Sequence, residues 1–105
     1  MTDAYTMGFW KAKAGEEDAL IAAWTEFAEW IKTQPGVRTL RLVRDLTEPA
    51  KFISFADWDG IDSIRAWKAS DDFKQRIANV KQHTDEFTAT EAELAVAVGE
   101  AAPVT

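Results

Sequence analysis

The chain of 105 residues contains no cysteine and only one histidine, His83. The absence of cysteine excludes disulfides, thiolate nucleophiles and sulfur-ligated metals. A single histidine cannot supply a multi-histidine metal site within one subunit. We therefore expect no metal centre in this protein.

Basic residues are outnumbered, because 12 Lys and Arg stand against 18 Asp and Glu and give a formal net charge of -6. Such a surface repels a phosphate backbone, so we expect no nucleic-acid partner. No apolar run approaches the roughly 20 residues of a membrane span, and residues 1–6 lack the basic and apolar segments of a secretory signal. We expect one cytoplasmic domain over residues 1–105, with no membrane contact and a loosely held tail at 99–105.

Tryptophan, by contrast, is abundant, with five residues. Each indole carries a large apolar area, and five of them are more than a small core usually absorbs. Part of this aromatic surface should therefore line a cavity or a subunit interface. The five residues are Trp10, Trp24, Trp30, Trp58 and Trp67.

The first third of the chain changes its hydrophobic period once. Residues Tyr5–Trp10 alternate with a period of two, which predicts a strand that ends at the Ala14-Gly15 turn. From Glu16 the period becomes helical and continues until Pro35-Gly36, where proline stops the helix. The apolar positions of this helix are Leu20, Trp24, Phe27 and Ile31.

A hairpin is predicted next, from strands over Val37–Asp45 and Lys51–Trp58 on either side of a turn that contains Pro49. Successive side chains of a strand point to opposite faces, so Phe52 and Phe55 lie on different faces of the sheet. Which of the two faces water depends on the register.

Two helical segments and a final strand complete the pattern. Ile61, Ile64 and Trp67 have helical spacing, and Ser70 is typical of the N-cap of a second segment, whose apolar positions are Phe73, Ile77 and Val80. Alternation of Ala92, Leu94, Val96 and Val98 predicts a last strand in the region after Phe87. The many Ala and Glu residues there favour a helix instead.

The element order is strand, helix, strand, strand, helix, strand. This order predicts an α+β, ferredoxin-like βαββαβ fold with a four-stranded antiparallel sheet. Both helices would cover one face of the sheet and leave the other open. Because an exposed apolar patch is best buried against a second copy, we expect a homodimer through the open sheet face.

Several motifs resemble a known family across nearly the whole chain, from Tyr5 to about Val98. They are Lys13-Ala-Gly15-Glu-Glu-Asp18, Trp24, Phe27-Ala-Glu-Trp30, Pro35-Gly36, Leu42-Val-Arg-Asp45, Phe52-Ile-Ser-Phe-Ala-Asp-Trp58 and Trp67-Lys-Ala-Ser70-Asp-Asp-Phe73. On these motifs the sequence resembles the antibiotic biosynthesis monooxygenase family of dimeric α/β barrels. The resemblance implies this fold directly.

Members of this family include haem-degrading enzymes and cofactor-independent oxygenases that turn polycyclic phenols into quinones. The haem-degrading branch has an Asn, a Trp and a His at positions that read Gly8, Trp58 and Ile77 in this chain. Only the Trp is present, and only a generous alignment would bring His83 to the iron, so the resemblance favours the branch that needs no metal or flavin. It implies a pocket between the sheet and the helices, with aromatic walls, for a small hydrophobic aromatic substrate.

Five residues are candidates for this site. Trp58, at a strand end, and Trp67, at a helix break, are candidates for stacking against a flat substrate, although both also fit a packed core. Tyr5 and Arg41 lie on strands and are candidates for holding a phenolate, if the register points them into the pocket. His83 is the one candidate catalytic base with a suitable ordinary pKa, but its polar neighbours are also typical of a solvated surface histidine.

Two functions follow from these features. The first is a cofactor-independent monooxygenase that acts on a planar phenol or quinol. The alternative is a non-catalytic dimeric domain of the same fold that binds a hydrophobic ligand or supports another protein. The resemblance implies an Asn in the quinone-forming oxygenases, and the only Asn of this chain, Asn79, does not match it. This missing Asn, the exposed surroundings of His83 and the lack of an acid-base pair on one predicted face favour the alternative.

Overall fold

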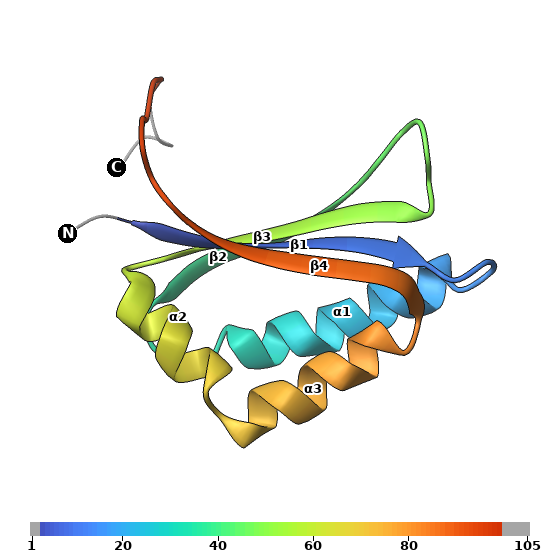
Figure 1. The fold of residues 1–105 in the computed structure, drawn as a ribbon, viewed down its shortest axis with the longest axis horizontal. Coiled ribbons are helices and arrows are strands. Elements are labelled where there is room, and N and C mark those ends of the chain that lie inside the picture. The colour runs from blue at the N-terminus through green and yellow to red at the C-terminus, as the bar shows by residue number, and fades with distance from the viewer. Residues whose placement is uncertain (1–2, 100–105) are drawn as a thin grey trace.

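The computed structural model describes residues 3–99, which form one sheet covered by one layer of helices (Figure 1). In chain order the elements are β1 (Ala4–Ala12), α1 (Glu17–Ile31), β2 (Val37–Arg44), β3 (Lys51–Trp58), α2 (Ile61–Lys68), α3 (Asp71–Lys81) and β4 (Thr84–Glu93). The strands form an antiparallel sheet in the order β2-β3-β1-β4, and the helices lie on one face of it. The predicted ferredoxin-like βαββαβ fold is confirmed, with α2 and α3 together in the place of the second helix.

The break between α2 and α3 follows from local capping. The Ser70 hydroxyl accepts a hydrogen bond from the backbone N–H of Phe73 at 3.1 Å, as predicted for an N-cap. Asp71 and Asp72 place negative charge in the first turn of α3, where the helix dipole favours it. Among residues 3–99, no helix combines the length and the apolar character that crossing a lipid bilayer requires.

The register of β3 decides which of its two phenylalanines is buried. Phe52 is opposite Trp10 of β1 and is 2% exposed, whereas Phe55 is opposite Met7 and is 37% exposed. The even-numbered side chains of β1 and β3 therefore face the helices, and the odd-numbered ones form the open face. The core on the helix side contains Trp58, Leu20, Ile64 and Val80, all of which are fully buried.

The last strand differs from the prediction. The structure places it at Thr84–Glu93, whereas the alternation of Ala92, Leu94, Val96 and Val98 had predicted a more C-terminal strand. Pairing explains the difference, because β1 begins at Ala4, opposite Glu93, and within residues 3–99 the pairing continues only by the hydrogen bond from Leu94 N–H to the Asp3 carbonyl oxygen at 2.8 Å. Val96 and Val98 are 75% and 92% exposed. Of the predicted tail at 99–105, all but the first residue lies outside the described residues.

Candidate functional site

A cavity of about 270 Å³ lies between the sheet and the helices. Every strand and every helix of residues 3–99 contributes to its wall. Most of the lining residues are apolar or aromatic, which suits a flat hydrophobic ligand. Met7 and Phe55 are among them, although their side chains lie on the open face of the sheet. The lining residues are Thr6, Met7, Gly8, Trp10, Trp24, Phe27, Ile31, Leu40, Ser54, Phe55, Ala56, Trp67, Lys68, Phe73, Ile77, Lys81, Phe87 and Ala89.

Two hydroxyl groups in the wall are each held by an indole. Trp10 Nε1 donates to Ser54 Oγ at 2.9 Å, and Trp58 Nε1 donates to Thr6 Oγ1 at 3.1 Å. A hydroxyl that accepts one hydrogen bond still has its own proton to donate. Within residues 3–99 neither hydroxyl donates to a protein acceptor, so both can donate to a bound molecule.

A third donor in the wall has no partner. The indole Nε1 of Trp67 is buried and makes no hydrogen bond with any group of residues 3–99. The Trp67 ring packs against Trp58 and Phe73, with ring centroids 5.0 and 4.7 Å apart. A buried donor without an acceptor costs about 1–3 kcal/mol. The Nε1 atom has almost no accessible surface and is covered by protein atoms, so the hydroxyls of Thr6 and Ser54 are the wall's donors for a carbonyl or phenolate oxygen.

Gly8 makes the pairing of Trp10 with Ser54 possible. A Cβ atom at this position would lie 2.7 Å from Ser54 Oγ and 2.8 Å from Trp10 Nε1, closer than real Cβ atoms approach. The haem-degrading branch has an Asn here, and in this chain the Trp10–Ser54 pair occupies the space of such a side chain. Ile77, where that branch has its histidine, also lines the cavity. The residues of this wall therefore do not fit a haem.

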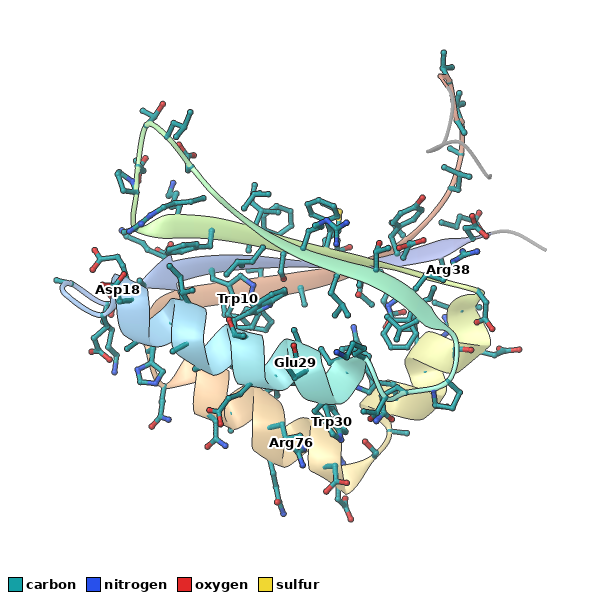
Figure 2. All side chains as sticks on the ribbon, turned by 180° about the vertical axis from the view of Figure 1, so that it is seen from behind. Trp10, Asp18, Glu29, Trp30, Arg38 and Arg76 are labelled. Atoms are coloured by element: carbon teal, nitrogen blue, oxygen red, sulfur yellow. The ribbon has the colours of Figure 1, made fainter. Side chains whose placement is uncertain are left out.

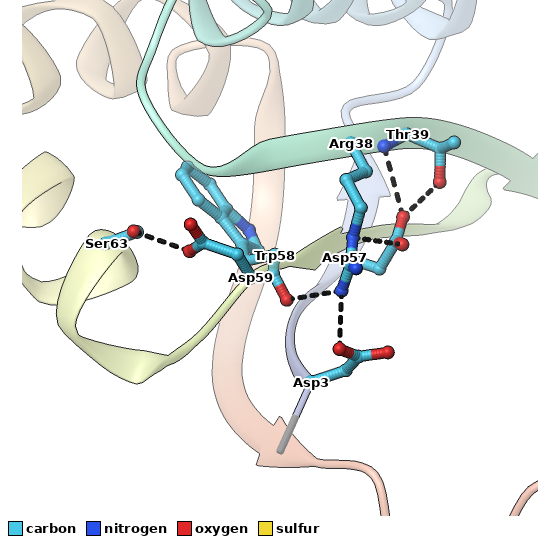
Figure 3. A network of polar contacts seen from close by, with 7 residues as sticks. All are labelled: Asp3, Arg38, Thr39, Asp57, Trp58, Asp59 and Ser63. Carbon is cyan, nitrogen blue, oxygen red and sulfur yellow. Dashed lines mark hydrogen bonds and ion pairs between the residues drawn. The ribbon is translucent and has the colours of Figure 1, made fainter. Parts of the chain in front are cut away.

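The far end of β3 is fixed by an ionic network around Arg38 (Figure 3). Arg38 Nη2 donates to the carbonyl oxygen of Trp58 at 2.8 Å and pairs with Asp3 at 2.8 Å, and its Nε pairs with Asp57 at 3.2 Å. The hydrogen bond to Asp3, followed by the nearby carboxylates, raises the pKa of Arg38. The network holds the backbone of Trp58, and the Trp58 indole in turn orients the Thr6 hydroxyl.

The structure does not bring the five candidate residues together. Trp67 lines the cavity, whereas Trp58 is fully buried behind Thr6, in the core position that was the alternative prediction. Tyr5 is opposite Asp57 and Arg41 is opposite Phe55, so both lie on the open face of the sheet. Their assignment to substrate binding stays a prediction.

His83 lies between α3 and β4 and outside the cavity wall. Its Nδ1 is 2.9 Å from Glu16 Oε1, and its carbonyl oxygen accepts from the backbone N–H of Lys13. These contacts join the end of α3 to the start of α1 and give the histidine a structural environment. A catalytic role for His83 stays a prediction.

Sequence reasoning missed four residues of the wall. Trp24 was predicted as one of the apolar positions of the first helix, without a place in the site, but it is only partly buried and lines the cavity. Trp10 was named only among the five tryptophans, and Thr6 and Ser54 were not singled out, although a hydroxyl at an inward strand position is a usable signal for a polar group in a cavity. Figure 2 shows Trp10 between the sheet and the helices, and Trp30 beside Arg76, whose Cζ lies 4.8 Å from the centre of the Trp30 ring.

Comparisons with known proteins agree with this architecture. Residues 4–79 match the family model described as antibiotic biosynthesis monooxygenase, and no curated protein matches the sequence. A solved Deinococcus radiodurans structure assigned to that family is similar with a TM-score of 0.81 and 19% identity, over 94% of this chain and 99% of the other. SnoaB, a cofactor-independent oxygenase from Streptomyces nogalater, is similar with a TM-score of 0.78 and 14% identity, over 94% and 97%.

Proposed function

Because the chain belongs to the antibiotic biosynthesis monooxygenase family, we propose that it is a cofactor-independent monooxygenase of a planar phenol or quinol. The observation that carries the proposal is the apolar cavity with two hydroxyl donors, from Thr6 and Ser54. A flat ring packs against the aromatic wall, and its oxygen accepts from these donors. Hydrogen bonds to the charged form lower the pKa of a bound phenol and stabilise the phenolate.

The phenolate is the reactive form because it is electron-rich enough to reduce oxygen without a metal or flavin. In the overall step a phenol with a hydrogen on the ring carbon to be oxidised, together with O₂, gives a quinone and water. One oxygen atom forms the new carbonyl at that carbon, and the other leaves as water with the hydrogen lost from the carbon and the hydrogen lost from the phenol hydroxyl. The substrate supplies all the electrons, so the protein is required only to bind, orient and stabilise it.

The test measures oxygen uptake with anthrone-like and hydroquinone substrates. Thr6→Val and Ser54→Ala each remove one hydroxyl donor with little change of shape, and we expect each to lower kcat, by up to about 100-fold for a donor that contacts the developing charge. Thr25→Val is the matched control, because Thr25 is exposed on α1 and bonded to the Ile21 carbonyl. Equal rates for all three variants would contradict the assignment of the donors.

A ligand-binding domain without catalysis is the alternative, and one observation favours it. No carboxylate or histidine lines the cavity among residues 3–99, so the wall holds no evident general base. Tryptophan quenching by phenols without oxygen uptake would support this alternative. If a broad phenol panel gave neither quenching nor oxygen uptake, both functions would be wrong.

The open face of the sheet supports a homodimer as part of the proposal. Phe9, Val43 and Phe55 are 41%, 45% and 37% exposed on this face, and they lie on the three neighbouring strands β1, β2 and β3. Burying such a patch is worth about 25 cal/mol per Å². Light scattering should return about twice the chain mass of 11.7 kDa. A monomer at micromolar concentration would contradict this part of the proposal.

A further inference from the structure

The cavity reaches the surface along the edge strand β4. Ala89 faces the helices, because it is the register partner of the buried Gly8, yet Ala89 itself is exposed. Gly8 is in turn opposite Ser54, which is buried on β3. The helical layer therefore covers the cavity over β1 and β3 and leaves it open beside Ala89.

Two lysines border this opening. Lys81, the last residue of α3, places Nζ 5.4 Å from the centre of the Phe87 ring. Lys68, the last residue of α2, places Nζ 3.1 Å from Glu91 Oε2. Phe87 and Glu91 lie two residues before and two residues after Ala89 on the same face of β4, so the lysines flank the opening on both sides.

The charge at the opening is positive, although the chain as a whole carries -6. Lys68 and Lys81 are the charged residues of the cavity wall within residues 3–99, and no acidic residue is among them. Glu91 offsets Lys68, whereas Lys81 has no carboxylate within ion-pair distance in the described part of the chain. One net positive charge therefore lies beside an apolar wall, on the exposed side chain of Lys81, where it attracts an anion at the opening.

We propose that the ligand of this cavity is an aromatic carboxylic acid, with its ring inside and its carboxylate at the opening. One net positive charge matches a monoanion. The carboxylate accepts from Lys81 Nζ, and Lys68 is close enough to the opening to exchange Glu91 for the ligand. This inference deepens the proposed function and rests on it, because it assigns a substrate class to the same cavity.

The experiment compares two probes of the same ring and size, a hydroxynaphthoic acid and its neutral carboxamide, by tryptophan quenching at neutral pH. We expect the acid to bind with an about tenfold lower Kd, because a charge-assisted hydrogen bond replaces a neutral one. Lys81→Gln should remove this preference and leave the Kd of the carboxamide unchanged. Lys74→Gln is the matched control, since Lys74 is exposed on α3 and outside the cavity wall.

The outcomes separate this inference from the proposed function. Equal Kd values for acid and carboxamide, or a preference that survives both Lys81→Gln and Lys68→Gln, would overturn the inference and leave the cavity as a phenol site. Quenching by neither probe would overturn both. Added salt should weaken binding of the acid and leave the carboxamide unaffected, and equal salt dependence of the two would also contradict the role of the lysines.

Discussion

The two faces of the sheet carry similar residue types and differ in what covers them. On the helix side, Trp58 and Phe52 are 0% and 2% exposed, whereas Phe55 and Phe9 on the open face are 37% and 41% exposed. All four are aromatic residues of β1 or β3. The comparison shows that the covering layer, and not the hydrophobicity of the strand, decides which aromatic residue belongs to the core.

The faces also differ in how polar groups are treated. On the helix side the hydroxyls of Thr6 and Ser54 are each paired with an indole N–H, because an unpaired buried polar group is costly. On the open face Arg41 remains exposed and donates to the adjacent Leu40 carbonyl. The helix side therefore presents donors in fixed directions, and a site built on it is organised before a ligand arrives.

The largest expected effect comes from truncating one aromatic residue on each face. Trp58→Ala leaves a cavity in the core and removes the donor to Thr6, so we expect a loss of about 3–5 kcal/mol in the free energy of unfolding. Phe55→Ala should cost the isolated subunit about 1 kcal/mol or less, because its ring is already partly in water. Urea denaturation at several protein concentrations separates the subunit from the proposed dimer. Equal losses in the free energy of unfolding for the two variants at low protein concentration would contradict this difference between the two faces.

A smaller effect is expected from adding one methyl group to the helix side. Gly8→Ala forces its Cβ into Ser54 Oγ and Trp10 Nε1, and overpacking of this kind costs about 1–3 kcal/mol. Gly60→Ala is the matched control, because a Cβ at Gly60 meets nothing within 4 Å. Thermal unfolding measures both variants, and tryptophan fluorescence reports the displacement of the Trp10 indole. If the Gly8→Ala protein were as stable as the Gly60→Ala protein, the side chains of the cavity wall would be able to move aside for the added methyl group.

The smallest effect is expected in the turn between β2 and β3, which is not part of either face of the sheet. The Asp45 carboxylate accepts from the backbone N–H groups of Glu48 and Thr47, and these bonds lower its pKa. Because the pKa of Asp45 is lower in the folded state than in the unfolded state, its carboxylate stabilises the fold at any pH above the ordinary aspartate pKa. This stabilisation is lost as the pH falls through the lowered pKa of the folded state. Asp45→Ala should therefore lower Tm slightly at neutral pH and not at strongly acidic pH. A Tm difference that is constant with pH would contradict the role of the charge.

The sequence predicted correctly those features that depend on residues close together in the chain. The helix after Glu16, the hairpin and the Ser70 cap follow from hydrophobic period and capping chemistry, and each is confirmed. The last strand was misplaced, because its position is set by pairing with β1 and not by its own alternation. The helix-facing positions of this edge strand are largely uncovered, so its true segment, Thr84–Glu93, is polar and carries little periodic signal.

The sequence by itself determined the element types, their order and the absence of thiol chemistry, because these depend on residues close together in the chain or on composition. Only the tertiary structure decided that Thr6, Ser54 and Trp67 share one cavity wall and that Tyr5 and Arg41 lie on the opposite face. A shift of one residue in register exchanges the two faces of a strand. The site therefore exists only through the pairing of strands that are distant in the sequence.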